Sequence, residues 1–473
     1  MIRTLAVTAA FAALCAFSAA AQPGPAPNFP GQAEFRDLYK ELIETNTTVS
    51  AGSCTVAAQE MAARLKAAGY PDADVRLLVP PDRPKDGNLL AVLHGADPKA
   101  KAILLLAHID VVEARREDWQ RDPFKLVEEN GYFYARGASD DKAMAASFTD
   151  AMIRYRKEGF RPRRDIKLAL TCGEETPDTF NGARWLMQTH RADMDAAFAL
   201  NEGAGGRLQG DRRVYLGIQA GEKVYQDYTL EVTNRGGHSS RPVRDNAIYH
   251  LAGGLTKIGL YDFPAHLNEA TRLHFQKMSA ILGGQMGGDM KAALQQPPPA
   301  AVVASIARDP GYNSMMRTTC VATMVSAGHA LNALPQRATA NVNCRILPGE
   351  APEAVMATLA KVMDDPAIHM RLAGEKSPVS PPPPLSPGIV GPAETVANEL
   401  WPGVPLVPAM STGATDGRFL TAAGVPTYGL SGMFGDSDGG GVHGLNERIR
   451  VRSLYEGREY LYRVVKLYAN QPG

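Results

Sequence analysis

The chain has 473 residues, more than one ordinary hydrophobic core accommodates, so two domains are expected. Apolar residues make up 45% and charged residues 21%, as in an ordinary soluble globular protein. The 50 basic residues balance the 50 acidic ones without a basic run, which argues against a nucleic-acid partner and against an anionic membrane surface as partner.

The first segment has the pattern of a secretory signal. Arg3 precedes an apolar stretch over residues 5–17, and the small residues "SAAAQ" follow. This pattern predicts a signal peptide over 1–21 that is cleaved after Ala21. The apolar stretch is too short for a comfortable membrane anchor. We therefore expect a secreted or periplasmic protein without a membrane attachment after cleavage.

Helical and strand patterns then alternate. Helical patterns cover residues 35–43, 57–70, 141–159 and 181–190, and strand patterns cover residues 88–95, 102–110, 166–175 and 196–203. Such alternation predicts an α/β domain with a largely parallel sheet, whose first part we assign to residues 22–221.

The pattern changes at about residue 222. Strands are expected at 224–234, 318–327 and 338–347, and helices at 246–259 and 352–365. This order predicts a small α+β domain over 222–376, inserted into the first domain. A polar, Pro-rich segment around residues 286–301, which we call the excursion, could not be assigned to an element of this domain. The stiff run "SPVSPPPPLSP" is a suitable return linker, after which the α/β pattern resumes over 377–473.

Four cysteines follow the predicted signal: Cys54, Cys172, Cys320 and Cys344. So few cysteines in a chain of this length do not make a disulfide scaffold. Only Cys320 and Cys344 lie in the same strand-rich region, and they are the candidate pair.

Metal-ligand residue types gather where predicted strands end. His108 ends the apolar run "ILLLAH", with Asp110 two places on. The remaining residues of this kind are Asp140 and Asp141 at the mouth of a helix, Glu174, Glu175 and Glu202 after strands, and His443 in a Gly-rich loop. Ligands of open α/β sheets bind at the carboxyl ends of the strands. Several separate acids and histidines on one rim therefore predict a metal site.

The stretches "AHID", "RGASDDK", "GEET", "NEG", "GGHSSRP" and "VHGLNER" occur in this order. In order and spacing they resemble the motifs of the zinc-dependent M20 metallopeptidase family of carboxypeptidases, aminoacylases and dipeptidases. The resemblance covers essentially the whole mature chain. It implies a zinc-exopeptidase-type catalytic domain and an inserted α+β lid domain of the kind through which members form homodimers.

The resemblance implies two zinc ions per chain. Asp140 would bridge both ions, His108 and Glu202 would complete one site, and Glu175 and His443 would complete the other. In such sites two metals about 4 Å apart hold a water and the scissile carbonyl. Open nitrogen and oxygen sites suit catalytic zinc, although Co²⁺ and Mn²⁺ accept similar ligands. A cis peptide bond between Asp140 and Asp141 is also implied.

Three residues take catalytic roles by the same resemblance. Glu174 would act as the general base, because it lies beside the ligands without being one. Asp110 would hydrogen-bond the far nitrogen of His108 and fix its tautomer. His238 of the lid would stabilise the oxyanion, after lid closure or delivery by a partner subunit.

Four positions match substrate-binding segments. Asn332 and Arg345 match lid positions that hold the substrate's carboxylate, for which the planar guanidinium of Arg is suited. Gly413 and Arg418 belong to "STGATDGRF", which resembles a loop facing the substrate. One departure from the family pattern is Asn201, which replaces an Asp before the ligand Glu202.

The sequence therefore predicts a di-zinc exopeptidase that cleaves an amide bond next to a free carboxylate, a carboxypeptidase acting on short peptides. Hydrolysis of N-acyl amino acids, as by an aminoacylase, and dipeptidase activity are alternatives that need the same metals. A rival of another class is a binding protein that has lost catalysis, against which the presence of base and ligands argues. A single-metal aminopeptidase is disfavoured by Arg345, since a free amine calls for an acidic partner.

Overall fold

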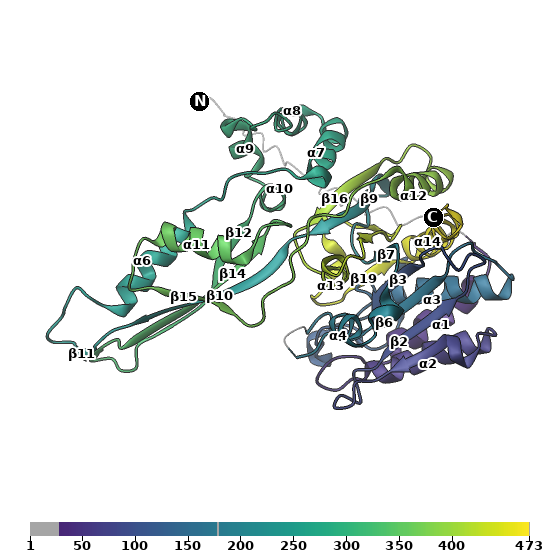
Figure 1. Ribbon diagram of the computed structural model, residues 1–473, viewed down its shortest axis with the longest axis horizontal. Coiled ribbons are helices and arrows are strands. Elements are labelled where there is room, and N and C mark those ends of the chain that lie inside the picture. The colour runs from purple at the N-terminus through teal and green to yellow at the C-terminus, as the bar shows by residue number, and fades with distance from the viewer. Residues whose placement is uncertain (1–27, 177–178, 473) are drawn as a thin grey trace, which may run out of the picture.

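The structure is a computed structural model that describes residues 28–176 and 179–472. The predicted signal at 1–21 lies outside the described residues. Figure 1 shows a body of helices around a large sheet, a second sheet that extends away from it, and a group of helices beside the junction. The chain visits the second sheet and these helices between two passes through the body, as an inserted domain requires.

The large sheet is mixed. In spatial order its strands are β1 (Val75–Leu78), β2 (Asn88–Leu93), β6 (Ile166–Thr171), β3 (Ile103–His108), β7 (Phe198–Asn201), β17 (Thr427–Gly429), β9 (Arg212–Glu222), β8 (Gly206–Gln209) and β18 (Phe434–Gly435), and β16 (Leu406–Ser411) also pairs with β9. The expected parallel pairing holds in the centre, over β6, β3, β7 and β17. The pairs β1–β2, β2–β6 and β17–β9 are antiparallel, so the sheet as a whole is mixed.

Helices cover both faces of this sheet. They are α1 (Gln32–Glu44), α2 (Cys54–Ala67), α3 (Lys142–Lys157), α4 (Gly182–Thr189), α5 (Arg191–Met194), α12 (Pro387–Leu400), α13 (Gly417–Ala422) and α14 (Val451–Asn470). Leu105 of β3 packs in one core with α1, α2, α3 and α14, whereas Leu104 and Leu106 pack in another with α4 and α13. Burial on both faces explains why β3 is apolar throughout until it reaches His108.

The second sheet belongs to the segment in which a lid domain was expected, and we call it the lid sheet and its domain the lid. Its antiparallel strands are, in order, β12 (Thr319–Ala327), β14 (Arg337–Ile346), β10 (Val224–Thr233) and β15 (His369–Ala373). Helices α6 (Ala247–Gly259) and α11 (Pro352–Met363) pack with β10 and β14 in a core of their own. A two-stranded extension, β11 (Gly237–His238) with β13 (Ala333–Leu334), forms its far tip (Figure 1).

The Pro-rich excursion and the residues around it are largely helical. It forms α7 (Glu269–Leu282), α8 (Gly284–Ala292), α9 (Ala300–Ile306) and α10 (Pro310–Met316). Their shared core includes Val407 of β16, so these helices pack against the large sheet. Asn268 and Asp309 cap α7 and α10 by accepting backbone N–H bonds.

A small antiparallel sheet stands apart from these layers. It consists of β4 (Val127–Glu129), β5 (Tyr132–Tyr134) and β19 (Arg448–Arg450). In the part of the chain that the structure describes, no helix is long and apolar enough to cross a membrane.

The cysteines form two disulfides. Cys320–Cys344 is the pair that the sequence suggested, and it joins neighbouring strands β12 and β14. Cys54–Cys172 joins the start of α2 to the end of β6 across 118 residues. The expectation of a single candidate pair was wrong, because a contact between elements so far apart leaves no local pattern in the sequence.

Candidate metal centre

Three parallel strands end at one edge of the large sheet. β3 ends at His108, β6 runs into the loop that carries Glu174 and Glu175, and β7 ends one residue before Glu202. Parallel pairing brings these ends together, which is why residues far apart in the sequence become neighbours.

The cluster contains two sets of possible ligands around Asp140. His108 Nε2 lies 3.1 Å from Asp140 Oδ1 and 3.8 Å from Glu202 Oε1. His443 Nε2 lies 3.2 Å from Asp140 Oδ2 and 2.9 Å from Glu175 Oε1. The ligand atoms of each set lie within 4.8 Å of one another. The two oxygens of Asp140 thus face two different histidines, as a bridging ligand requires.

The electrostatics of the cluster reflect an excess of negative charge. Burial, with neighbouring carboxylates, raises the pKa of Glu174 and of Glu202 well above the usual range. Asp140 is the exception: burial would raise its pKa, but hydrogen bonds from His108 and His443 hold it below the usual range. Hydrogen bonds with Asp140 and Glu175 raise the pKa of His443 to about 10.

Divalent metal ions fit this donor set. Among the described residues, the ion-pair partners of Asp140, Glu175 and Glu202 are the two histidines. Imidazole nitrogens and carboxylate oxygens are also the donors of catalytic zinc sites. The peptide bond between Asp140 and Asp141 is cis.

Asp110 contacts both the His108 ring and the glutamate loop. His108 Nδ1 lies 3.1 Å from the backbone carbonyl of Asp110 and 3.6 Å from its carboxylate. The carboxylate instead accepts the backbone N–H groups of Glu174 and Glu175, at 3.2 and 3.0 Å. The far nitrogen of His108 was expected to bond the Asp110 carboxylate. In the structure its nearest acceptor on Asp110 is the backbone carbonyl, and the carboxylate lies farther away, where it accepts the two amides.

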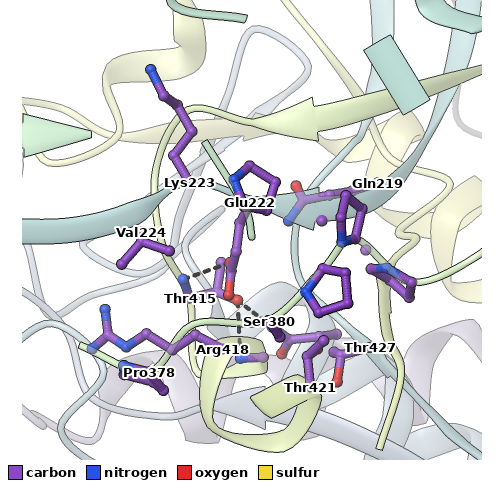
Figure 2. A pocket seen from close by; sticks show the side chains of 18 of the residues that line it. Gln219, Glu222, Lys223, Val224, Pro378, Ser380, Thr415, Arg418, Thr421 and Thr427 are labelled. Atoms are coloured by element: carbon purple, nitrogen blue, oxygen red, sulfur yellow. Dashed lines mark hydrogen bonds between the residues drawn. The ribbon is translucent and has the colours of Figure 1, made fainter. Parts of the chain in front are cut away.

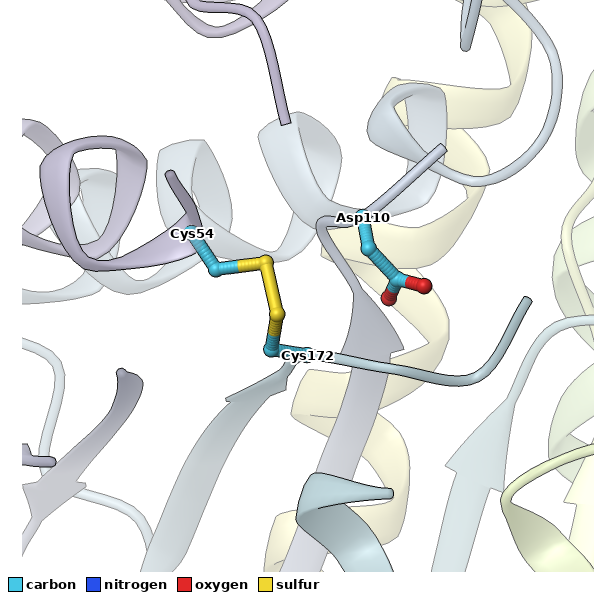
Figure 3. Close-up of side chains that lie close together, drawn as sticks. All are labelled: Cys54, Asp110 and Cys172. Atoms are coloured by element: carbon cyan, nitrogen blue, oxygen red, sulfur yellow. A yellow bond between two sulfur atoms is a disulfide. The ribbon is translucent and has the colours of Figure 1, made fainter. Parts of the chain in front are cut away.

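The disulfide Cys54–Cys172 lies beside this loop. Figure 3 shows the two sulfur atoms next to Asp110. Cys172 comes two residues before Glu174 in the sequence, so the disulfide anchors the loop to α2 from one side while Asp110 holds it from the other.

A small cavity adjoins the cluster where the two domains join, and we call it the hinge cavity. Its lining includes the ligand Glu202, and also Glu222 and Arg418. Figure 2 shows Glu222 and Arg418 facing this space, while Lys223 turns away from it. Glu222 accepts the N–H of Thr415 at 2.8 Å.

The predicted carboxylate-binding Arg345 lies near this cavity. Its guanidinium lies 4.6 Å from the ring centroid of Tyr225, which lines the cavity. Burial lowers the pKa of Arg345, and the positive charge of Arg418 lowers it further. Arg345 from the lid and Arg418 from α13 are therefore electrostatic neighbours. Gly413 lies in the loop before α13, where its N–H bonds to Ser411.

His238 and Asn332 lie elsewhere. Both belong to the tip around β11 and β13, where both are exposed and the N–H of Ser239 donates to the carbonyl of Asn332. His238 Nδ1 accepts the backbone N–H of Ser240 at 3.1 Å. Figure 1 places this tip at the end of the lid farthest from the large sheet. Within one chain in this conformation, these two residues are therefore separated from the metal centre.

Comparison with known proteins identifies the family. The model of peptidase family M20/M25/M40 matches residues 104–467. The chain belongs to this family. It is 26% identical over 386 residues to the N-fatty-acyl-amino acid synthase/hydrolase PM20D1 of Mus musculus, with 80% of this chain and 76% of that protein covered.

One further relative and one solved structure agree with this family and its fold. A probable carboxypeptidase S-like 2 of Dictyostelium discoideum is 27% identical over 389 residues, covering 79% of this chain and 72% of that protein. The M20 family metallo-carboxypeptidase Sso-CP2 from Sulfolobus solfataricus superposes with a TM-score of 0.69 at 20% identity, over 92% of this chain and 99% of that one. The protein is thus an M20 hydrolase with the fold expected of it.

Sequence reasoning missed two residues that shape this M20 site. Glu447 is 1% exposed, and its carboxylate accepts the backbone N–H groups of Ser139 and Asp140. Asp416 is equally buried and accepts hydrogen bonds from Thr171 and Asn181 beside the glutamate loop. Glu447 stands in the quoted stretch "VHGLNER" and Asp416 in "STGATDGRF", but their backbone and side-chain partners lie in distant segments.

Asn201, which departs from the family pattern, also forms a side-chain hydrogen bond. Its side-chain amide donates to the hydroxyl of Thr415 at 2.9 Å. The N–H of the same Thr415 reaches Glu222 in the hinge cavity. The residue before the ligand Glu202 is thereby linked to the junction of the two domains.

Proposed function

We propose that this chain is a two-zinc hydrolase that cleaves an amide bond adjacent to a free carboxylate. The observation that carries the proposal is the position of Glu202, a ligand candidate that also lines the hinge cavity with Arg418. A substrate amide at the metal centre can extend its carboxylate into that cavity. There it would meet the guanidinium of Arg418, and Arg345 lies beside Tyr225 of the same cavity. Guanidinium is the group best suited to a carboxylate.

His108, Glu202, Glu175 and His443 would hold the metals, with Asp140 shared between them. Zinc supplies Lewis-acid polarisation of the carbonyl and activation of water. Co²⁺ or Mn²⁺ suits the same donors.

Glu174 is the proposed general base. Its loop is held by the Asp110 carboxylate through the N–H groups of Glu174 and Glu175. The buried carboxylate, whose pKa is raised by burial, takes a proton from the attacking water and passes it to the leaving nitrogen. A fixed loop keeps the carboxylate oxygen in place for both transfers, and His238 would stabilise the oxyanion once it is delivered.

Two substrate classes fit this chemistry. A carboxypeptidase would act on short peptides, and a dipeptidase on the shortest of them. An aminoacylase would act on N-acyl amino acids, the substrate type named in the PM20D1 relatives. Both classes carry the free carboxylate that Arg345 and Arg418 would read.

The test compares matched substrates on the purified, zinc-loaded chain. We expect hydrolysis of dipeptides or N-acyl amino acids, and a large loss when the same substrates carry a C-terminal amide. Equal rates on acids and amides contradict the carboxylate assignment. Absence of hydrolysis on both classes favours the rival, a binding protein without catalysis.

We also propose that the protein is exported and cleaved after Ala21. Two disulfides in the described part of the chain support an oxidising compartment. N-terminal sequencing of protein from fractionated cells should find Gln22 first, in the exported fraction. An intact N-terminus in the cytoplasmic fraction contradicts the proposal.

A further inference from the structure

A second cavity opens from the metal centre, between the loops 203–207 and 431–442, and we call it the loop cavity. It begins at Asp140 and Glu202 and is open to solvent. Glu202 lines the hinge cavity as well. In an amide substrate, the free carboxylate lies on the nitrogen side of the scissile bond and the acyl group on the other side. If the hinge cavity takes the carboxylate, the loop cavity is the space left for the acyl group.

The walls of the loop cavity are rich in basic groups. Three arginines line it, and they are Arg207, Arg448 and Arg450. Two of these already have acidic partners: Arg448 pairs with Asp438 at 2.6 Å, and Arg450 pairs with Asp211 and Asp436 at 2.6 Å each. Arg207 is exposed, and no acid of the described part of the chain lies within ion-pair distance of its guanidinium. Arg207 is therefore the basic group of this cavity that is left for a ligand.

The strand pairing places Arg207 beside Tyr215. Arg207 of β8 and Tyr215 of β9 are directly opposite each other in an antiparallel pair, so their side chains stand on the same face of the sheet. Both line the loop cavity. Burial raises the pKa of Tyr215, and the positive charge of Arg207 acts against that rise. The guanidinium thus lies near the phenol ring.

Tyr312 supplies a second phenol from the inserted helices. A third cavity, which we call the helix cavity, lies between α10 and β16 and shares Ala204 and Tyr215 with the loop cavity. Tyr312 of α10 lines the helix cavity, and the rings of Tyr215 and Tyr312 both pack against the core of the inserted helices. Within the described residues, neither phenol O–H has a hydrogen-bond partner. Two held O–H donors and one guanidinium therefore border the place where the cavities join.

The acids near this place are engaged elsewhere. Asp436 pairs with Arg450. Asp309, which lines the helix cavity, accepts the backbone N–H of Tyr312 at 2.9 Å. Donors without an acceptor of their own suit a carboxylate, which accepts several hydrogen bonds and is attracted by the permanent charge of a guanidinium. A methyl group or an ammonium group at the same place would leave these donors unpaired.

We propose that Arg207, with Tyr215 and Tyr312, forms a subsite that binds a carboxylate on the acyl side of the scissile bond. The preferred substrates then carry one carboxylate on each side of the amide. They are N-acyl amino acids whose acyl group is a dicarboxylic acid, or peptides with an acidic residue before the cleaved bond. This inference rests on the proposed function and assigns its acyl side.

A matched series of substrates tests the subsite. The N-butanedioyl, N-hexanedioyl and N-octanedioyl derivatives of alanine are compared with the N-butanoyl, N-hexanoyl and N-octanoyl derivatives, which end in a methyl group. A hydrogen bond to a charged group is worth about tenfold to a hundredfold in binding. At the chain length that reaches Arg207, we expect kcat/KM to be about tenfold or more higher for the diacid than for its partner.

A further pair distinguishes the two sources of the carboxylate. N-pentanedioyl-alanine and α-glutamyl-alanine differ only in the α-amino group of the latter. The compound with the higher kcat/KM shows whether the subsite serves a dicarboxylic acyl group or an acidic peptide. α-Glutaminyl-alanine, which lacks the acyl-side carboxylate, should be hydrolysed about tenfold less efficiently than α-glutamyl-alanine.

Two variants locate the carboxylate. Arg207→Gln removes the charge, so the diacid to monoacid ratio of kcat/KM should fall about fivefold or more. Tyr312→Phe removes only the O–H, and the ratio should fall by a smaller factor. Arg212→Gln is the matched control: Arg212 is exposed at the start of β9, where it bonds to Gln209, and it lines neither cavity. This control removes the same charge from the same pair of strands and should leave the ratio unchanged.

The outcomes separate this inference from the proposed function. Diacids that are no better than their partners at every length overturn the subsite while amide hydrolysis stands. An equal fall of the ratio in Arg207→Gln and Arg212→Gln overturns it too, because a general charge effect then explains the preference. If no compound is hydrolysed, the proposed function fails, and calorimetric binding of the same pairs to the zinc-loaded chain tests the subsite alone. Diacids that bind no more tightly than monoacids in that assay overturn the inference as well.

Discussion

The buried carboxylate of Glu447 determines how the loop before the bridging Asp140 is held. Its Oε1 accepts the N–H groups of Ser139 and Asp140 at 2.8 and 3.0 Å. Its Oε2 accepts the N–H of Gly137 at 3.0 Å and the guanidinium of Arg136 at 2.8 Å. Glu447→Gln keeps the shape, but one oxygen becomes an NH₂ group that faces two donors.

The expected loss follows from these four bonds. A hydrogen bond to a charged group contributes about 1.5–3 kcal/mol, and two of the four are lost. Removing one partner of a buried ion pair costs about 3–5 kcal/mol, and this figure already includes the bond to Arg136. We therefore expect Glu447→Gln to lower the free energy of unfolding by about 3–5 kcal/mol and to weaken metal binding, because Asp140 loses its support.

Denaturant unfolding of the metal-free chain measures the first effect, and competition with a chelator measures the second. Glu128→Gln is the matched control, since Glu128 pairs with Arg36 at 3.0 Å where the two side chains are 46% and 40% exposed. That exposed pair should contribute less than about 1 kcal/mol. If Glu447→Gln behaves like the control in both assays, the carboxylate does not hold the loop.

Three further predictions address the site. Glu174→Gln should retain its metal in elemental analysis, while kcat falls roughly 10²- to 10⁴-fold because the amide cannot accept a proton. Activity near that of the wild type would remove Glu174 from the base role. Arg345→Lys should reduce kcat/KM roughly tenfold to hundredfold for substrates with a free carboxylate and much less for the amidated substrates, because Lys lacks the paired donors of Arg. Equal losses for both substrate types contradict the assignment of Arg345 to the carboxylate. Burial raises the pKa of Glu222 to about 7, above its usual 4.5. The stability that the protonated Glu222 contributes is therefore present below its unfolded pKa and is lost as the pH rises through about 7. Between pH 5.5 and 8, the free energy of unfolding in urea should fall by about 1–2 kcal/mol less for Glu222→Gln than for the wild type. Identical pH profiles of the two proteins contradict this.

The ligand candidates were accessible to sequence reasoning because each follows an identifiable strand end. His108 closes an apolar run, and Glu202 follows another, so a parallel sheet alone brings them to one edge. Asp140 and His443 lie in loops, and their motif resemblance located them instead. The structure brings His108, Asp140 and Glu202 together, and likewise Asp140, Glu175 and His443.

What the sequence did not reveal depends on tertiary contacts. Glu447 acts on backbone N–H groups about 310 positions away, and any acid in a loop looks the same in sequence. Helix α8 contains Gly287 and Gly288, which disfavour helices, and forms because it packs on α7. The disulfide Cys54–Cys172 likewise depends on the packing of α2 beside the end of β6.

The position of His238 leads to a prediction about assembly. The tip that carries it lies away from the metal centre of its own chain (Figure 1). β12 is an edge strand of the lid sheet, and Val321, Met324 and Val325 on it are 59%, 72% and 69% exposed. An apolar edge of this kind is suited to pairing with a second copy, and closed two-fold dimers are the commonest oligomers. We therefore expect a homodimer through the lid in which each subunit delivers His238 to its partner's site.

Mixed dimers distinguish delivery by a partner from closure of the lid within one chain. His238→Ala alone should lower kcat roughly 10²- to 10³-fold with metal retained, the usual effect of losing one oxyanion donor. If this variant is mixed with Glu174→Gln chains and subunits exchange freely, half of the dimers are mixed. Each mixed dimer then has one site with both groups intact, so about a quarter of wild-type activity should return. Delivery within one chain leaves every site defective, and mixing then restores nothing. The control is Val325→Lys at the edge of the lid sheet. It should produce monomers in sedimentation, and it should abolish the activity regained on mixing, because delivery of His238 to the partner's site requires pairing through that edge.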